Sequence, residues 1–266
     1  MGKNNTIFCE TKCLNKLSKA LHNLWVSNTL TDVLLYVGCN STFRCHKIIV
    51  LAFCPKYKNK ILKTRLNEIL EIKLPNSTDQ GISQILSYMY TSEIHIHLYN
   101  FAEIMISSYE LDMDDLIKES ESFIQKYIDE RSSSDKCNVD DFSLIIRSFC
   151  VLKPICNKTI FKKLMSYVAD NFDCLMSTEE FLDLDVCILK DFLSNYRICV
   201  NSEENLLDGI LRWIRRDYGS RFFHEKDLLF RINFQFISPK NLRNFELSES
   251  IMNFPCIKKK ILLSQK

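Results

Sequence analysis

The order of apolar and polar residues in the first half of the chain predicts a helix followed by a small hairpin. Leucines recur at spacings of three and four between Cys13 and Val26, which lines one face of a helix. An isolated helix of this length is marginal in water, so we expect other apolar surface to cover that face. Two apolar strands flank a Gly38-Cys39-Asn40 turn, whose residues tolerate the positive φ of a tight hairpin. The leucines of the helix face are Leu14, Leu17, Leu21 and Leu24, and the strands are Asp32–Val37 and Thr42–Arg44.

Short alternating elements continue to residue 128. Pro55 separates two short helices because its ring cannot continue the first one. Ser77 or Thr78 is suited to cap the next helix. The predicted elements are, in order, helices Ile48–Phe53 and Lys56–Leu66, a strand Ile69–Leu74, a helix Ser77–Met89, a turn Tyr90–Ser92, a strand Glu93–Ile96, and helices Tyr99–Tyr109 and Met113–Ile128.

The second half of the chain has a purely helical pattern. It follows a polar, serine-rich segment, Asp129–Lys136, of the kind that links folding units. Ser202, followed by Glu204 and Asn205, is a sound helix start because its hydroxyl can accept backbone N–H groups and the acidic charge suits a helix N-terminus. The main predicted helices are Val139–Cys150, Thr159–Phe172, Ser177–Leu184, Ile188–Leu193 and Val200–Ile214.

The first half resembles a BTB (POZ) domain. Its pattern combines Asp-Val before an apolar strand, Phe and His-Lys at a turn, and a Cys-Pro-x-Tyr turn after an apolar run, with Cys45 where the family usually has Ala. A later Tyr-x-Tyr-Thr run has Ser92 in place of the usual Gly. The resemblance implies an α+β domain over residues 7–128 that forms a homodimer through the leucine helix and Asp32. The residues that carry it are Asp32, Val33, Phe43, His46, Lys47, Ala52, Cys54, Pro55, Tyr57 and Tyr88–Ile94.

The second half resembles the BACK domain that follows BTB in Kelch-like proteins. The resemblance rests on Glu180–Leu184, the Ser202-Glu203 cap and Trp213-Ile214, and it implies an all-α domain over residues 137–245, with a tail over residues 246–266. Kelch repeats need about fifty residues each and paired glycines. Because 24 residues follow Leu242 and none of the 5 glycines are adjacent, we expect no propeller. The Ile-, Asn- and Lys-heavy usage is similar to that of poxviral Kelch-like proteins.

Bulk composition narrows the partners and the compartment. A formal net charge of +2 provides no global field that would recruit nucleic acid or an anionic membrane. Several of the 12 cysteines lie within apolar patterns, as Cys150, Cys156, Cys187 and Cys199 do, which favours reduced thiols in the cytoplasm, or the host cytoplasm for a viral protein. No apolar run is long enough to span a bilayer. The N-terminus fits a loose myristoylation pattern at Gly2, although one acyl chain binds membranes only marginally.

The residues give no basis for an enzyme. His95 and His97 lie two apart, the minimum for two metal ligands on a strand, but no third ligand completes a site. The resemblance makes Asp32 and His46 buried polar residues that fix the dimer and the strand–helix corner, rather than a catalytic pair. Phosphate loops, G-x-S-x-G and H-E-x-x-H are absent from the sequence. We therefore expect no catalytic residues, no metal and no cofactor.

The resemblance also implies a cullin-3 site. BTB proteins that bind cullin-3 carry an apolar-x-Glu element between the third helix and the next strand, where this chain has Leu66-Asn67-Glu68. Leu66 would supply an apolar anchor and Glu68 a charge that pairs with the partner. Interfaces concentrate their energy in such anchors. The expected cullin-binding residues are Tyr57, Leu66, Asn67, Glu68, Tyr99, Asn100 and Glu103.

These observations favour a dimeric BTB-BACK adaptor that binds cullin-3. It would either recruit an unknown host protein to a ubiquitin ligase or compete with host adaptors. Competition is favoured, because the BACK pattern shows no exposed apolar stripe that packing between its own helices leaves unexplained. The alternatives are a BTB oligomerisation scaffold that binds no cullin, and a membrane-tethered immune modulator acylated at Gly2.

Overall fold

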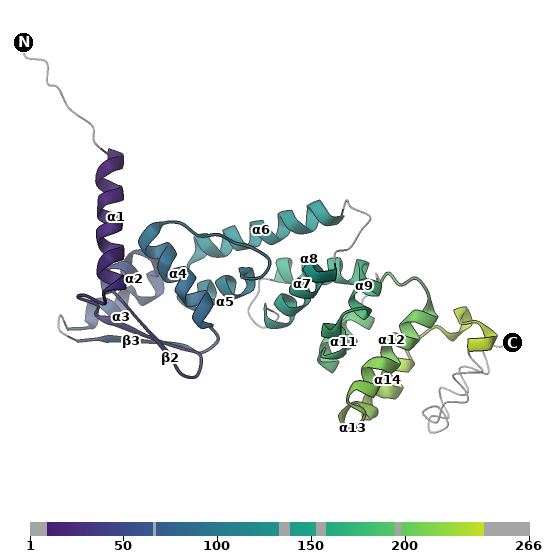
Figure 1. Cartoon of the computed structure of the whole chain (residues 1–266). Helices are drawn as coiled ribbons and strands as arrows, with labels where there is room; N and C mark the ends of the chain where they lie inside the picture. The colour runs from purple at the N-terminus through teal and green to yellow at the C-terminus, as the bar shows by residue number, and fades with distance from the viewer. Residues whose placement is uncertain (1–9, 66–67, 133–138, 153–157, 195–197, 242–266) are drawn as a thin grey trace, which may run out of the picture. The chain divides into compact units, whose positions relative to one another are not determined.

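The computed structural model describes residues 10–65, 68–132, 139–152, 158–194 and 198–241 (Figure 1). The chain folds into two compact units that divide between Ile124 and Gln125. The elements of the first unit are α1 (Glu10–Val26), β1 (Val33–Val37), β2 (Ser41–Cys45), α2 (Lys47–Phe53), the 3-10 turn η1 (Pro55–Tyr57), α3 (Lys58–Lys63), β3 (Leu70–Leu74), α4 (Asp79–Thr91), α5 (Phe101–Leu111) and the start of α6 (Asp114–Ser132).

The first unit is built on a three-stranded sheet in the order β2-β1-β3. β1 pairs antiparallel with β2, Leu35 opposite Phe43, and parallel with β3, Leu35 opposite Ile72. Buried and exposed residues alternate along β3, because successive strand side chains point to opposite faces of a sheet. One face therefore supplies the floor of the core, and it is formed by Val33, Leu35, Val37, Leu70, Ile72 and Leu74.

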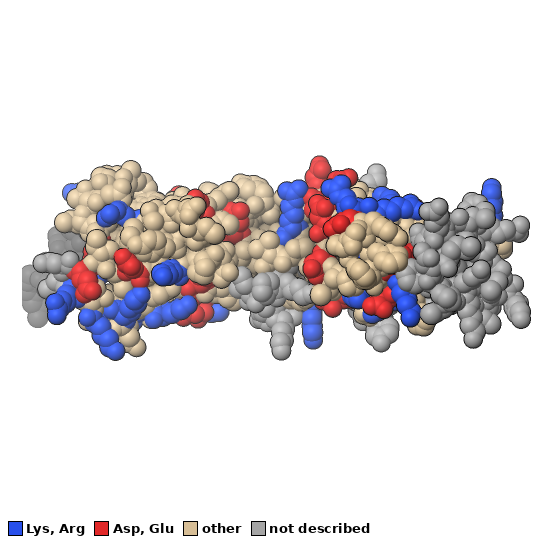
Figure 2. Space-filling view, turned by 90° about the horizontal axis from the view of Figure 1, so that it is seen from below, with Lys and Arg blue, Asp and Glu red and all other residues tan. Residues whose placement is uncertain are grey.

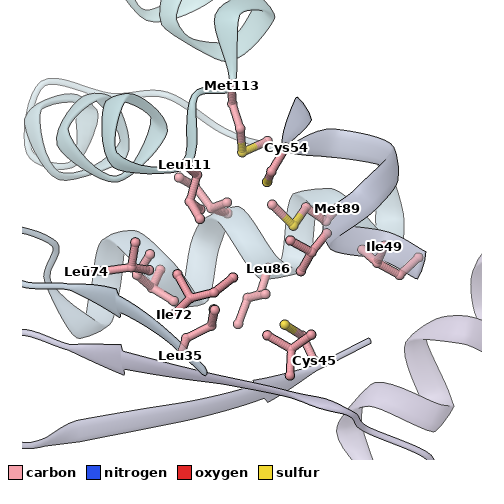
Figure 3. Close-up of a cluster of buried hydrophobic side chains, with 14 of the residues drawn as sticks. Leu35, Cys45, Ile49, Cys54, Ile72, Leu74, Leu86, Met89, Leu111 and Met113 are labelled. Atoms are coloured by element: carbon pink, nitrogen blue, oxygen red, sulfur yellow. The ribbon is translucent and has the colours of Figure 1, made fainter. Parts of the chain in front are cut away.

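Helices cover that apolar face of the sheet. Figure 3 shows strand residues meeting side chains from α4 and from the α5–α6 junction; the labelled ones are Leu35, Ile72, Leu74, Leu86, Met89, Leu111 and Met113. The Thr78 hydroxyl caps α4 by accepting the Gly81 N–H at 3.1 Å. Helices α4 and α5 cross closely at Gly81, where a Cβ would lie 2.7 Å from the backbone oxygen of Glu103.

The predicted strand Glu93–Ile96 is wrong. Residues 93–97 form no strand, and several of their backbone groups bond to side chains instead of to a neighbouring strand. The Glu93 N–H donates to the Thr91 hydroxyl at 3.3 Å, and the His97 N–H donates to Asn100 Oδ1 at 2.7 Å. The other predicted elements of this unit are present with shifted ends; for example, α3 stops at Lys63 and α5 starts at Phe101.

The second unit is helical. Helix α6 continues to Ser132, so the segment predicted as a linker begins within a helix. The predicted helix Thr159–Phe172 is two helices, which meet at Asn171. The further elements are α7 (Val139–Leu152), α8 (Lys158–Asp170), α9 (Phe172–Met176), α10 (Glu179–Leu182), α11 (Val186–Leu193), α12 (Glu203–Arg216), α13 (Tyr218–Arg221), η2 (Phe222–His224), α14 (Glu225–Leu229) and η3 (Phe234–Phe236).

Helix α12 is the centre of the second unit and packs against α9, α10 and α14. Its predicted cap is confirmed, because the Ser202 hydroxyl accepts the Asn205 N–H at 3.1 Å. Trp213 is buried, its indole N–H donates to the Leu184 carbonyl at 3.0 Å, and the Arg221 guanidinium lies 4.1 Å from the centre of its ring system. These contacts hold α12 against the segments that surround it.

The surface of the second unit differs from the prediction in two ways. Four large aromatic residues are exposed, which the helical pattern of the sequence did not predict. Their exposed fractions are 80% for Phe223, 73% for Phe236, 59% for Phe230 and 48% for Tyr218. Cys187 and Cys199 are exposed rather than set in the core, because each falls on the outer side of its segment; Cys156 lies outside the described residues.

Candidate protein-interaction site

The predicted leucine face of α1 divides into two parts. Leu21 packs against the core of its own unit, and Leu24 is half-buried. Leu14 and Leu17 are 62% and 56% exposed. Figure 1 shows the N-terminal half of α1 extending away from the other elements of the first unit. The first part therefore anchors the helix, and the second leaves an apolar surface in solvent.

Asp32 is engaged within its own protomer. Its carboxylate accepts the Lys47 N–H, at the first residue of α2, at 2.7 Å. Its backbone N–H donates to Cys45, and its carbonyl accepts the Leu70 N–H, so it bonds to both neighbours of β1. An anion at a helix N-terminus is favourable. The hydrogen bonds of Asp32 within one protomer therefore explain its role at the strand–helix corner. Its role in dimerisation stays a prediction.

The segment from Lys56 to Ile69, which we call the α3 edge, contains the central predicted cullin residues. Leu66 and Asn67 lie outside the described residues. Glu68 is exposed, and its carboxylate accepts the Arg65 N–H at 3.3 Å. The Lys47 ammonium donates to the carbonyls of Arg65 and Glu68, so it links these two residues to the start of α2.

Sequence reasoning missed Leu62 and Ile69 on the α3 edge. Leu62 is 67% exposed and Ile69 is 49% exposed, one on each side of Leu66 and Asn67. A signal was present in the sequence: Ile61 and Leu62 are adjacent, and a one-sided helix of six residues can bury only one of them. The structure buries Ile61, so Leu62 is left facing solvent.

Tyr57 lies where the α3 edge meets the C-terminal end of α5. Its hydroxyl donates to the Glu110 carbonyl at 3.3 Å, and the Lys56 ammonium donates to the same oxygen at 3.2 Å. Burial, followed by the nearby Cys54, Glu110 and Asp112, raises the pKa of the Tyr57 phenol to about 12. Tyr57 is half-buried, so it holds the edge in place and offers only part of its ring to a partner.

The other three predicted residues gather at the opposite end of α5. Tyr99 is 62% exposed and its ring stacks on His97 at 5.1 Å, while Asn100 is 2% exposed. The Asn100 amide donates to the His95 carbonyl and to Gln84 at 2.9 and 3.1 Å, so it shapes the loop rather than facing a partner. Glu103 is half-buried.

The structure therefore does not bring all of the predicted residues into one cluster. Glu103 and Glu110, seven residues apart on α5, are separated along the helix by about 10 Å at 1.5 Å per residue. Tyr57 and the α3 edge meet the Glu110 end, whereas Tyr99 and Asn100 lie at the other. A partner that touches both groups must span most of α5.

Two further features concern the metal-ligating side chains and the buried thiols of the described residues. None of their His, Cys, Asp and Glu side chains gather in groups of three or more that could hold a metal ion. Burial raises the pKa of the Cys54 thiol to about 12 and that of the Cys45 thiol further, so both stay protonated at neutral pH. Over the same part of the chain, no helix is long and apolar enough to cross a membrane.

Comparisons with known proteins agree with this division of the chain. Residues 21–128 match the BTB/POZ domain family, and residues 145–246 match the family described as BTB And C-terminal Kelch, or BACK. A solved structure, the BTB domain of zebrafish PATZ1, aligns with 46% of this chain and 99% of its own, at 21% identity and a TM-score of 0.40.

Several curated relatives match nearly the whole chain. Human Kelch repeat and BTB domain-containing protein 12 is 24% identical over 86% of this chain and 35% of its own length. Zebrafish Kelch-like protein 40b is 27% identical over 93% of this chain and 38% of its own, and human Kelch-like protein 7 is 24% identical over 93% and 39%. The chain thus spans less than half the length of these relatives. It carries a BTB domain followed by a BACK domain, and the curated relatives that it matches include Kelch-like proteins.

Proposed function

We propose that this protein is a homodimeric BTB-BACK adaptor that binds cullin-3 through the α3 edge. BTB domains of this family commonly dimerise and bind cullin-3. The observation that carries the proposal is the exposure of Leu62, Glu68 and Ile69, which flank Leu66-Asn67 in the sequence. Exposed apolar side chains in the same segment as an exposed carboxylate suit an anchor-and-rim interface better than they suit an isolated domain.

Dimerisation rests on the exposed part of α1. Leu14 and Leu17 lie on the same helix face as the anchored Leu21, and together they present apolar surface that a second copy can cover. Removing such surface from water contributes roughly 25 cal/mol per Å² of apolar area, from which the entropy cost of association is subtracted. The homodimer would then present two α3 edges to the ligase.

The second unit supports recruitment of a host protein rather than competition alone. Exposed Phe223, Phe230 and Phe236 give the BACK unit aromatic surface of the type enriched at interfaces. A pure competitor needs only the first unit. We therefore propose that the BACK unit contacts the recruited protein, in the cytoplasm.

Cullin binding is tested with the purified 266-residue chain and the N-terminal domain of cullin-3 by biolayer interferometry. Leu66→Ala together with Glu68→Ala should weaken binding at least thirtyfold, because truncating a central anchor commonly costs about 2 kcal/mol or more. The matched control is Val151→Ala with Glu119→Ala, two exposed residues that do not belong to the α3 edge, which should bind as wild type does. If the wild-type chain does not bind cullin-3, the alternative of a BTB oligomerisation scaffold would be favoured instead.

Recruitment is tested by expressing the chain in cells and measuring the ubiquitinated proteome. New ubiquitination of one protein that depends on Leu66 and Glu68, and that is lost in Phe223→Ser with Phe236→Ser, would support recruitment by the BACK unit. Stabilised substrates of host adaptors, with no newly modified protein, would instead show that the chain acts as a competitor.

A further inference from the structure

The α3 edge is the most basic short segment of the described chain. Between Pro55 and Arg65 it carries no acidic residue, although the whole protein has a formal net charge of only +2. All of its basic residues are exposed: Lys56, Lys58, Lys60, Lys63 and Arg65. Figure 2 shows several Lys and Arg side chains along one edge of the first unit, with a few Asp and Glu side chains beside them.

The charge of this segment is not neutralised by neighbouring groups. The ammonium groups of Lys56 and Lys60 donate to the backbone carbonyls of Glu110 and Glu71, which fixes their positions without cancelling their charge. Among the described carboxylates, none lies within ion-pair distance of the five basic side chains. Glu68 is the one acidic residue at the end of the segment, and it accepts a backbone N–H.

An apolar side chain lies among these cations. Leu62 is 67% exposed; it follows Lys58 by four residues, on the same side of α3, and immediately precedes Lys63. An exposed leucine with cations near it complements, in polarity and charge, a partner surface on which an apolar side chain is flanked by Asp or Glu. Single-stranded nucleic acid fits this surface poorly, because it needs exposed aromatic rings for stacking and the ring within the segment, Tyr57, is half-buried against α5.

We propose that the basic residues of the α3 edge dock an acidic stretch of the same partner that covers Leu62 and Glu68. This inference rests on the proposed function, which makes cullin-3 that partner. The cations raise the rate of encounter by electrostatic steering, while the apolar anchors set the lifetime of the complex. Charges at the rim of an interface act mainly on the association rate and its salt dependence.

The test is to measure association and dissociation rates with the cullin-3 N-terminal domain at low and at high salt. Lys58→Glu with Lys63→Glu should slow association about tenfold or more at low salt, change dissociation less than about twofold, and match wild type at high salt, where charges are screened. The control, Lys118→Glu with Lys126→Glu, makes the same charge change at exposed lysines of α6 and should leave both rates unchanged.

Each result bears on one proposal or the other. If cullin-3 binds and its association rate depends neither on Lys58 and Lys63 nor on the salt concentration, the docking inference is wrong. The proposed adaptor function would remain. A wild-type chain that does not bind would remove both. Binding of a 20-nucleotide oligonucleotide at physiological salt, lost in the double variant while cullin-3 binding is kept, would assign the edge to nucleic acid and also overturn the inference.

Discussion

Tyr90 and His46 are joined by two hydrogen bonds that fix which ring nitrogen of His46 carries the proton. His46 Nε2 lies 2.9 Å from the Thr29 carbonyl, which can only accept, so the proton of the neutral ring is on Nε2. Nδ1 then accepts from the Tyr90 hydroxyl at 2.5 Å, and that oxygen in turn accepts the His46 N–H at 3.1 Å. Trp25 of α1 stacks on the Tyr90 ring at 5.0 Å.

Tyr90→Phe should lower the free energy of unfolding by about 1–3 kcal/mol. The substitution removes the hydroxyl and leaves buried His46 with an unsatisfied ring nitrogen and backbone N–H, which costs free energy of that order. Urea denaturation followed by circular dichroism measures it. Tyr36→Phe is the control, because that exposed hydroxyl makes one 3.3 Å bond and its loss should cost less than about 0.5 kcal/mol. Equal changes in the free energy of unfolding for the two variants would show that the bonds between Tyr90 and His46 do not stabilise the fold more than an exposed hydrogen bond does.

Leu14→Asp with Leu17→Asp should convert the dimer to a folded monomer. Both side chains are exposed in the protomer, so the charges harm only an interface that would bury them. Light scattering at micromolar concentration gives the mass, and circular dichroism reports the fold. Leu21→Asp should instead destabilise the protomer, because Leu21 packs on the core. A wild-type monomer at this concentration would refute the dimer.

Gly81→Ala should destabilise the protein more than Gly209→Ala does. A Cβ at Gly81 would lie 2.6 Å from the Ser107 hydroxyl and 2.7 Å from the backbone oxygen of Glu103, so α4 and α5 must separate. A Cβ at Gly209 meets the sulfur of Met176 at 2.5 Å, and that flexible side chain can move. Thermal unfolding of the two variants compares the costs. The reverse order would mean that the α4–α5 crossing is not tight.

The elements with a strong apolar period were predicted correctly from the sequence. The prediction of a strand was wrong where side chains, instead of a neighbouring strand, bond to the backbone. The Leu14–Leu24 repeat and the Ser202 cap appear as expected. Glu93–Ile96 has the alternation of a strand, but Asn100 and Thr91 take its backbone bonds, and no local pattern shows that a later asparagine will do so. Contacts with residues outside the segment therefore determine its conformation.

The candidate site was predicted less completely, for a geometric reason. Family resemblance located Tyr57, Glu68 and Tyr99 in the chain, but spacing alone could not place Tyr57 and Tyr99 at opposite ends of α5. Asn100 was assigned to the partner, whereas its amide bonds inside the loop. The exposed rings of Phe223, Phe230 and Phe236 were missed because their segments are too short to show a helical period.

Glu225 should make the BACK unit less stable as pH rises through neutrality. Its side chain is buried, the residue being 1% exposed, and neither carboxylate oxygen has a hydrogen-bond partner in the structure. Burial raises the pKa of this carboxyl to about 7, against about 4.3 in an unfolded chain. The folded state therefore holds a proton that the unfolded chain releases. The stabilisation is complete below about pH 4, is lost as pH rises from there to about 7, and changes little at higher pH.

Glu225→Gln removes that titration and should raise the free energy of unfolding at pH 8 by about 2 kcal/mol relative to wild type, with little gain at pH 5. Urea denaturation at pH 5, 6, 7 and 8 gives the profile. Asp227→Asn is the matched control: the hydrogen bond and charge of Lys190 lower the pKa of Asp227, so its contribution changes only below about pH 4 and its difference from wild type should be constant over this range. If the Glu225→Gln difference is equally constant, the buried carboxyl is already charged at pH 5, and the raised pKa is wrong.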